Sequence, residues 1–252
     1  DNARPVEYAA IFVLTTGLCA AFLHALAWSG YASIPILRGI GWVLVAMAPF
    51  EIRRWRLAPA REVLREHFNE ASWTERLGLA ISLVIIIALF CAVFGPATDT
   101  DSLEYHLGVP LDWLRHAGAY ARPDWFHARL AGLGEAINML GLAMGTDNLG
   151  AVFQAAGLIV ALIGVTAFAT TRSARIFGML CVAACPVIIT LITAQKWQMF
   201  PAAGLTIALI LLVDRARRFD YRTALLVFGC AAFAAGCKYS FLLSSGVVVL
   251  CG

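Results

Sequence analysis

Long apolar blocks restrict the fold of this 252-residue chain more than any other feature of its sequence. Seven blocks follow one another, each close to or above the about 20 residues that a helix needs to cross bilayer hydrocarbon. Inside the blocks the apolar residues do not alternate with polar ones, as they do in transmembrane β-strands. Only 14% of the residues are charged, against about 25% in a soluble domain. The sequence therefore predicts an all-α, polytopic transmembrane helical bundle and excludes a soluble domain.

The blocks define about eight spans. They cover residues 8–28, 34–50, 77–96, 148–169, 175–192, 197–213 and 223–252. The last block is too long for one untilted span and is interrupted at Gly236-Cys237-Lys238, so we read it as two helices, or one helix and a re-entrant piece, that meet near Lys238. We divide the chain into two N-terminal spans with a polar loop (1–76) and a second module (77–252), which we expect to be truncated at its C-terminal end.

The distribution of basic residues predicts the orientation of the spans. With the N-terminus in the cytoplasm, thirteen of the nineteen Lys and Arg residues fall in cytoplasmic segments and five fall outside, as the positive-inside rule requires. The stretch 51–76 then reads as a surface helix on the cytoplasmic leaflet. The net charge of +3 reflects these loop arginines, and we expect no binding to nucleic acid.

The loop over 97–147 faces outward on this topology and carries most of the chemistry. Seven of the sixteen carboxylates and three of the five histidines lie in it, and a long polar loop is the usual place for function. An amphipathic helix is predicted from Asp101 or Ser102, either of which is a good N-cap, to about His116. Pro110 is expected to kink it, and it is expected to lie on the membrane surface. Its apolar stripe would consist of Leu103, Leu107, Leu111 and Leu114.

Asp99 and Asp101 stand where the third span gives way to this helix. A carboxylate there is suited to act as a base on an incoming hydroxyl or amine, or to bind a divalent cation such as Mg²⁺ or Mn²⁺. The D-x-D spacing permits a cation without requiring one. The alternative is structural: one aspartate caps the helix and the others are solvated loop charges.

A second polar cluster runs over 122–129 and contains Arg122 and His127. A helix over about 130–144 follows it and carries Glu135 among apolar and glycine residues. A lone acid on such a helix is costly near lipid, so we expect Glu135 to face a cavity or to pair with Arg122 or Arg129. The alternative is an ion pair with a purely structural role.

The chain has only two lysines, Lys196 and Lys238. Lys238 lies between two apolar stretches at the outer side, where a lysine would bind an anionic headgroup or phosphate. The alternative is that it snorkels to the interface. Lys196 is followed by Trp197, and we interpret this pair as an interfacial boundary with the tryptophan in the aromatic belt.

Three motifs resemble those of a known family. Asp101-Ser102-Leu103-Glu104-Tyr105-His106-Leu107, with Pro110 after it, resembles the start of the first large periplasmic loop in bacterial GT-C membrane glycosyltransferases, the protein mannosyltransferase-like and aminoarabinose transferase-like enzymes. Gly134-Glu135-Ala136-Ile137-Asn138-Met139-Leu140 is similar to a later helix of that loop. Gly236-Cys237-Lys238-Tyr239-Ser240 is similar to a third segment. The motifs occur in the family's order, and the resemblance covers roughly 95–252.

The resemblance implies transfer of a sugar from a polyprenyl-phosphate carrier to an acceptor on the periplasmic face of a bacterial inner membrane. By position, Asp101 becomes the catalytic acid or base, or a metal ligand, and Glu135 a second catalytic acid. Lys238 would contact the donor phosphate, and Tyr105 and His106 would shape the site. From the second polar cluster, Arg122 and His127 are expected to help bind the substrate or its phosphate.

Two other classes of function remain open. A structural or accessory membrane subunit would tolerate substitution of the loop acids and would not bind lipid phosphate. A transporter is less favoured, because the carboxylates gather in a loop and no symmetric pair of broken helices is evident. For the enzyme, the expected partners are the polyprenyl-phosphate sugar donor and membrane lipids.

Overall fold

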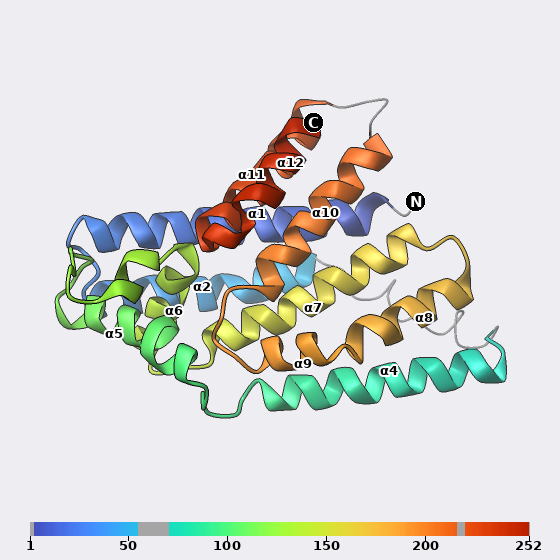
Figure 1. Cartoon of the computed structure of the whole chain (residues 1–252), viewed down its shortest axis with the longest axis horizontal. Coiled ribbons are helices and arrows are strands. Elements are labelled where there is room, and N and C mark those ends of the chain that lie inside the picture. Colours follow the sequence, from blue (N-terminus) through green and yellow to red (C-terminus); the bar gives the residue numbers. More distant parts are fainter. Residues whose placement is uncertain (1–2, 55–70, 216–219, 252) are drawn as a thin grey trace.

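A computed structural model describes residues 3–54, 71–215 and 220–251, and within them the chain forms helices and no strands (Figure 1). The all-α prediction is confirmed. The first long helices are α1 (Ala3–Trp28), α2 (Ile34–Arg54) and α4 (Trp73–Ala92). The predicted surface helix over 51–76 lies mostly outside the described residues.

Helix α4 begins with a capping box. The N–H of Ser72 donates to Oε2 of Glu75 at 2.9 Å, and the N–H of Glu75 donates back to Oγ of Ser72 at 3.4 Å. The two bonds satisfy backbone donors that no earlier turn can serve. The cap therefore fixes the start of α4 at the end of the polar stretch, close to the start predicted for the third span.

The outer loop folds into four short elements. A π-helical turn, η1 (Ser102–Leu107), continues directly into α5 (Gly108–Arg115). A 3₁₀ turn, η2 (Phe126–Leu130), precedes α6 (Leu133–Met144). Gly145 ends α6 with φ +90°, a left-handed conformation that glycine adopts without strain.

The C-terminal half contains α7 (Leu149–Phe168), α8 (Arg172–Ala183), α9 (Pro186–Ile192), α10 (Met199–Arg215) and α11 (Tyr221–Cys237). A 3₁₀ turn, η3 (Tyr239–Phe241), and α12 (Leu242–Cys251) follow. Lys238 has an extended backbone, with φ −157° and ψ 137°. The predicted division of the last apolar block near Lys238 is therefore confirmed.

The predicted number of eight spans is not confirmed. Among the described residues, three helices are long and apolar enough to cross a membrane, namely Pro5–Trp28, Trp73–Ala92 and Leu149–Phe168. A fourth span results if α8 and α9, which meet at a 59° bend, count as one. Helices α10 and α11 have 17 residues each, which gives only about 25 Å at 1.5 Å per residue. The apolar helices are consistent with an integral membrane protein.

One hydrophobic core joins helices that are far apart in sequence. Helix α1 packs against α6, α10 and α11, and α10 packs against α7. The rings of Phe12, Phe153 and Phe200 meet at centroid distances of 5.5 to 6.5 Å, and Phe233 lies 5.8 Å from Phe200. Helix α4 lies at one edge against α8. The N-terminal helix is thus part of the same core as the C-terminal helices.

The bundle has two different ends (Figure 1). At one end, on the left of the view, η1, α5 and α6 gather with the last turn of α1 and the start of α7. The starts of α4, α8 and α11 lie toward the other side of the molecule, and each carries arginine in its first turns. The acid-rich outer loop and these arginine-bearing helix starts are therefore separated by the length of the helices.

Candidate functional site

The helix predicted after Asp101 is present as η1 and α5. Leu107 and Leu114 of the expected apolar stripe are buried, while Leu103 and Leu111 are 53% and 40% exposed. Tyr105 and His106 are buried as well. A π-turn bonds residue i to i+5 and so has more residues per turn than an α-helix, which rotates the following side chains away from the 3.6-residue pattern. The polar His106 tolerates burial because it finds an acidic partner.

Pro110 lies in the first turn of α5, which continues η1 without a break. A proline cannot donate to the carbonyl four residues before it, and here that carbonyl belongs to His106. The side-chain amide of Asn138 donates to this oxygen instead, at 2.8 Å. Pro110 thus leaves an acceptor that ties η1 to α6.

His106 and Glu135 form a buried pair. Nδ1 of His106 lies within hydrogen-bonding distance of Oε1 of Glu135, at 2.6 Å, and the N–H of Gly132 donates to Oε2 at 2.7 Å. Glu135 is 0% exposed and stands in the first turn of α6, where the helix dipole favours a carboxylate. The acid therefore has partners for both oxygens and caps its own helix.

The expectation that an arginine would pair with Glu135 was wrong. Arg122 donates to Asp112 at 3.0 Å and to Asp124 at 2.9 Å. Arg129 donates to the carbonyl of Pro123 at 3.1 Å. Both arginines lie on the surface of the loop, and His106 of η1 pairs with Glu135 in their place. Burying a histidine side chain costs less free energy than burying a guanidinium.

The segment 193–198, between α9 and α10, completes the buried network. Nε1 of Trp197 donates to Oδ1 of Asn138 at 3.1 Å. The N–H of Gln195 donates to Oγ of Ser102 at 3.0 Å. Trp197 is 1% exposed, so its assignment to an aromatic belt was wrong. It packs against Gly134, where an added Cβ would lie 2.0 Å from the indole, and no side chain other than glycine's fits there.

Lys196 forms ion pairs with both aspartates of the D-x-D motif. Its Nζ lies 3.2 Å from Oδ1 of Asp99 and 3.1 Å from Oδ2 of Asp101. The N–H of Ser102 donates to Oδ1 of Asp99 at 3.0 Å, so Asp99 is the residue that caps η1, and not Asp101 or Ser102 as predicted. Asp101 is left with a side chain that is 72% exposed. It is the accessible acid of the cluster.

The ion pairs shift the titration of two members of this cluster. Partial burial lowers the pKa of Lys196, but its hydrogen bonds to Asp101 and Asp99 outweigh the burial and hold the pKa above its usual value. Burial likewise raises the pKa of Asp99, while hydrogen bonds from Ser102 and Lys196 outweigh it and hold the pKa below its usual value. Both groups are therefore charged throughout the neutral range.

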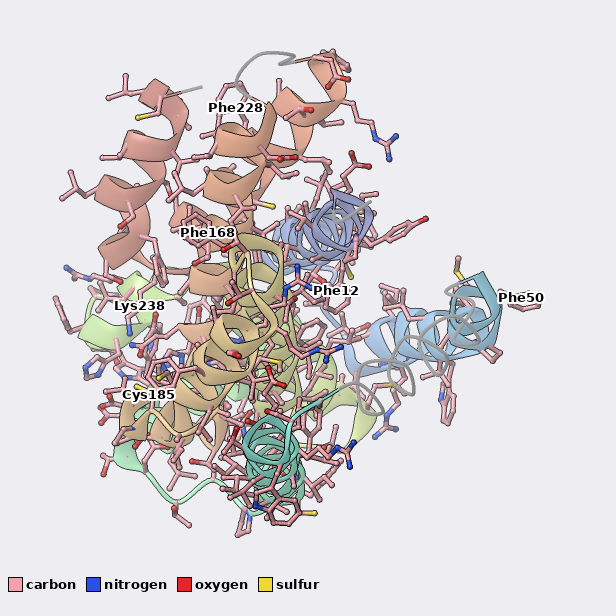
Figure 2. The ribbon with its side chains drawn as sticks, turned by 90° about the vertical axis from the view of Figure 1, so that its right-hand side faces the viewer. Phe12, Phe50, Phe168, Cys185, Phe228 and Lys238 are labelled. Atoms are coloured by element: carbon pink, nitrogen blue, oxygen red, sulfur yellow. The ribbon has the colours of Figure 1, made fainter. Side chains whose placement is uncertain are left out.

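Lys238 lies close to this cluster. In Figure 2 it lies beside the green ribbon of the outer loop and away from Phe50. Burial lowers the pKa of Lys238, the charges of Glu135 and Asp101 raise it, and the charge of Lys196 lowers it. All three charged groups therefore interact electrostatically with the ammonium of Lys238. Asp101 is thus ion-paired with one of the chain's two lysines, Lys196, and its charge also acts on the other, Lys238.

A close backbone approach holds Lys238 next to α6. A Cβ added to Gly132 would lie 2.4 Å from the carbonyl oxygen of Gly236 and 2.9 Å from that of Cys237. Only glycine allows the start of α6 to meet the end of α11 at this distance. The contact brings the Glu135 cap and the α11 break into one place.

Three other predicted site residues lie elsewhere in the loop. Arg122 stacks over the ring of Trp125 at 5.3 Å, in addition to its two carboxylate partners. His127 pairs with Glu104 at 3.1 Å. The hydroxyl of Tyr105 donates to the carbonyl of Leu130 at 2.6 Å, and burial raises its pKa. These contacts organise the loop, and none of them is with Asp101.

The donor set at Asp99 and Asp101 does not fit a divalent cation as it is arranged. Each carboxylate has an oxygen within 3.2 Å of Nζ of Lys196, so an ammonium already supplies the positive charge between them. In the part of the chain that the structure describes, three or more His, Cys, Asp or Glu side chains never gather in a geometry that could hold a metal ion.

Sequence reasoning missed several residues of this end of the bundle. The contacts above add Ser102, Asn138, Gln195, Lys196 and Trp197. One signal was available: the polar run Gln195-Lys196-Trp197-Gln198 interrupts two apolar segments. A run of this kind is costly beside lipid unless its polar groups find partners, and its interpretation as a boundary overlooked that requirement.

Comparison with known proteins identifies one family. The model of the DUF1420 N-terminal domain matches residues 50–252, which include the D-x-D motif, Glu135 and both lysines. Comparison with curated proteins gives no match, and comparison with solved structures gives none either. The match covers most of the chain and the whole of the cluster described above, and the chain therefore belongs to the DUF1420 N-terminal domain family.

Proposed function

We propose that this protein is a membrane glycosyltransferase that moves a sugar from a polyprenyl-phosphate carrier to an acceptor, with Asp101 as the general base. The observation that carries the proposal is the exposed carboxylate of Asp101 in its ion pair with Lys196, with its charge also acting on Lys238. Transfer of this kind needs a base for the acceptor and positive charge for the phosphate, and this cluster offers both. The motif resemblance adds support, since it points independently to Asp101 and Lys238.

The chemistry divides between the two kinds of group. Asp101 takes the proton of the acceptor hydroxyl as its oxygen attacks the anomeric carbon. Lys238 binds the phosphate of the donor as a compact point charge. The lowered pKa of Lys238, caused first by its burial, reflects a desolvated ammonium, and a desolvated charge binds an anion more strongly than one in water.

In this proposal Glu135 and His106 position the site and do not contact the substrate. Both are buried, and Glu135 already has a partner for each oxygen. Their pairing fixes η1, which begins one residue after Asp101. A base that must lie within hydrogen-bonding distance of its proton depends on such support.

We also propose that the end of the bundle with η1, α5 and α6 faces the periplasm and that the arginine-bearing end faces the cytoplasm of a bacterial inner membrane. The separation of the two ends supports this orientation, together with the positive-inside rule. A membrane-impermeant amine reagent should label Lys238 in intact cells. Labelling that occurs only after the cells are broken would reverse the orientation.

The transferase proposal is tested by Asp101→Asn. Membranes containing the protein are given a polyprenyl-phosphate sugar with a radiolabelled sugar, and transfer to the endogenous acceptor is measured. Loss of a general base costs about 10²- to 10⁴-fold in rate. Asp147→Asn is the matched control, because Asp147 is an exposed acid of the same loop outside the cluster. Equal rates in Asp101→Asn and the unmodified protein would refute the proposal.

A structural or accessory subunit is the second candidate. It is favoured by the sealing of Glu135 and His106, two of the predicted site residues, inside a hydrogen-bonded network. A subunit of this kind would lose stability when the network is broken but would tolerate Asp101→Asn and would not bind polyprenyl phosphate. The same transfer assay, with a vesicle-binding assay beside it, separates the two candidates.

A further inference from the structure

We propose that the ammonium of Lys196 exchanges its ion-pair partner during sugar transfer, from the carboxylate of Asp101 to the phosphate of the departing carrier. This inference rests on the proposed function and adds a residue that neither the motif resemblance nor the family match assigns. Lys196 would be a positioning residue for the base before the reaction and an anion-binding residue after it.

The backbone around Lys196 is held firmly, while its side chain reaches the cluster. On one side, Oε1 of Gln195 accepts from the N–H of Ala151 at 2.9 Å, and the N–H of Gln195 donates to Ser102. On the other side, Trp197 is buried and bonded to Asn138. Lys196 itself is 22% exposed. A lysine on such an anchor can exchange partners by rotating its side chain alone.

The charges of the reaction require such an exchange. The donor is a phosphodiester with one negative charge. As the acceptor oxygen forms its bond to the anomeric carbon, its proton passes to an oxygen of Asp101, which becomes neutral. The bond from the anomeric carbon to the phosphate oxygen breaks, and the electron pair leaves with the phosphate, which becomes a dianionic monoester. One negative charge disappears 3.1 Å from Nζ of Lys196 and one appears on the phosphate.

The other charges near Asp101 favour this role for Lys196. Asp99 still holds the lysine at 3.2 Å, so the ammonium stays near the cluster when Asp101 is neutral. The charges of Glu135, Asp101 and Lys196 also act on Lys238, but among the residues that the structure describes Lys238 has no ion pair with Asp101 of the kind that Lys196 has. Glu135 is occupied by His106 and Gly132. Lys196 is therefore the cation whose partner changes charge in the reaction.

The test uses Asp101→Asn as a mimic of the protonated base. Fluorescent short-chain polyprenyl monophosphate is titrated against the purified protein in phosphatidylcholine vesicles. Asp101→Asn should bind the monophosphate roughly two- to tenfold more tightly than the unmodified protein, the range that one ion pair at a partly exposed position supplies. Lys196→Met should abolish this gain in the double variant, and Lys196→Arg should keep most of it.

Two further arms identify what is bound. The neutral polyprenol reports binding of the hydrocarbon tail alone, and its affinity should not change in Asp101→Asn. Inorganic phosphate as competitor reports binding of the free anion. If inorganic phosphate shows the same gain, the site recognises the anion itself; if only the lipid phosphate shows it, the tail also contributes. Both results support the role of Lys196.

Amine labelling gives a readout that does not depend on binding or activity. Since the chain has only two lysines, mass spectrometry follows each separately. Lys196 should react slowly in the unmodified protein and faster in Asp101→Asn, and polyprenyl monophosphate should protect it in that variant.

An unchanged or weaker affinity of Asp101→Asn for the monophosphate overturns the inference, whether or not sugar transfer is lost. Sugar transfer by Asp101→Asn at the normal rate overturns the proposed function instead.

Discussion

Two groups of polar residues meet around η1 and the 193–198 segment and have different environments. The sealed network consists of Ser102, His106, Glu135, Asn138, Gln195 and Trp197, all of them buried. The ion-pair cluster consists of Asp99, Asp101 and Lys196, and its side chains are exposed to between 22% and 72%. Neighbours in sequence belong to different groups: Asp101 precedes Ser102, and Lys196 stands between Gln195 and Trp197.

The difference separates a structural role, carried by the sealed network, from a role in binding, carried by the ion-pair cluster. The hydrogen bonds among these six residues join different elements, so the network fixes η1, α6 and the 193–198 segment together. The cluster has charged groups with little else to bond, so it can exchange partners. Substitutions in the first group should therefore lower stability, while substitutions in the second should change binding and titration.

The largest expected effect comes from breaking the buried histidine–glutamate pair. Glu135→Ala should destabilise the protein by about 3 kcal/mol, because it leaves His106 and the N–H of Gly132 buried without an acceptor. Thermal unfolding in detergent measures the loss. The chain provides a matched control in Glu104→Ala, which removes the exposed partner of His127 and should change stability by less than about 1 kcal/mol. Similar losses in both variants would show that burial does not distinguish the pairs.

The packing of the network can be tested next, at Gly134. Gly134→Ala places a methyl group against the indole of Trp197 and should cost about 1 to 3 kcal/mol through overpacking. It should also shift the tryptophan fluorescence as the indole moves. Gly39→Ala is the control, because an added Cβ there meets nothing within 4 Å and alanine is the better helix former. An unaltered melting temperature in Gly134→Ala would contradict the close contact.

The smallest effect is the pH dependence of the open cluster. The pKa of Asp99 is lowered in the folded protein by its hydrogen bonds from Ser102 and Lys196. Its contribution to stability is therefore present above the unfolded pKa of about 3.9 and is lost as the pH falls through the folded value. The melting temperatures of the protein and Asp99→Asn should differ slightly near pH 7, by less than about 1 kcal/mol, and converge in acid. A difference that grows in acid would give the opposite sign.

Parts of this architecture could be predicted from the sequence because they depend on local signals. The helical class follows from apolar blocks, and the break at Lys238 follows from a polar residue inside one of them. The count of eight spans is not confirmed, because 17-residue helices and a 59° bend look like full spans in a hydropathy pattern.

The candidate site was only partly predictable for a different reason. Asp101 and Lys238 could be singled out from local sequence, because Asp101 opens a recognisable motif and Lys238 is a charged residue between two apolar stretches. The partners of Asp101 and Glu135 depend on contacts between residues 29 and 95 positions apart, such as His106 with Glu135 and Asp101 with Lys196. The π-turn that buries His106 also leaves no clear mark in a helical pattern. Long-range pairing of this kind appears only once the chain is folded.

Pro110 leaves the carbonyl of His106 without a backbone donor, and Asn138 supplies the donor from another helix. Any other residue at position 110 restores an amide N–H that competes for the same oxygen, and any residue at 138 without an amide leaves that oxygen without its donor. The two positions should therefore change together among relatives, although their side chains serve each other only through a third residue. Relatives that keep proline at position 110 should therefore also keep asparagine at position 138.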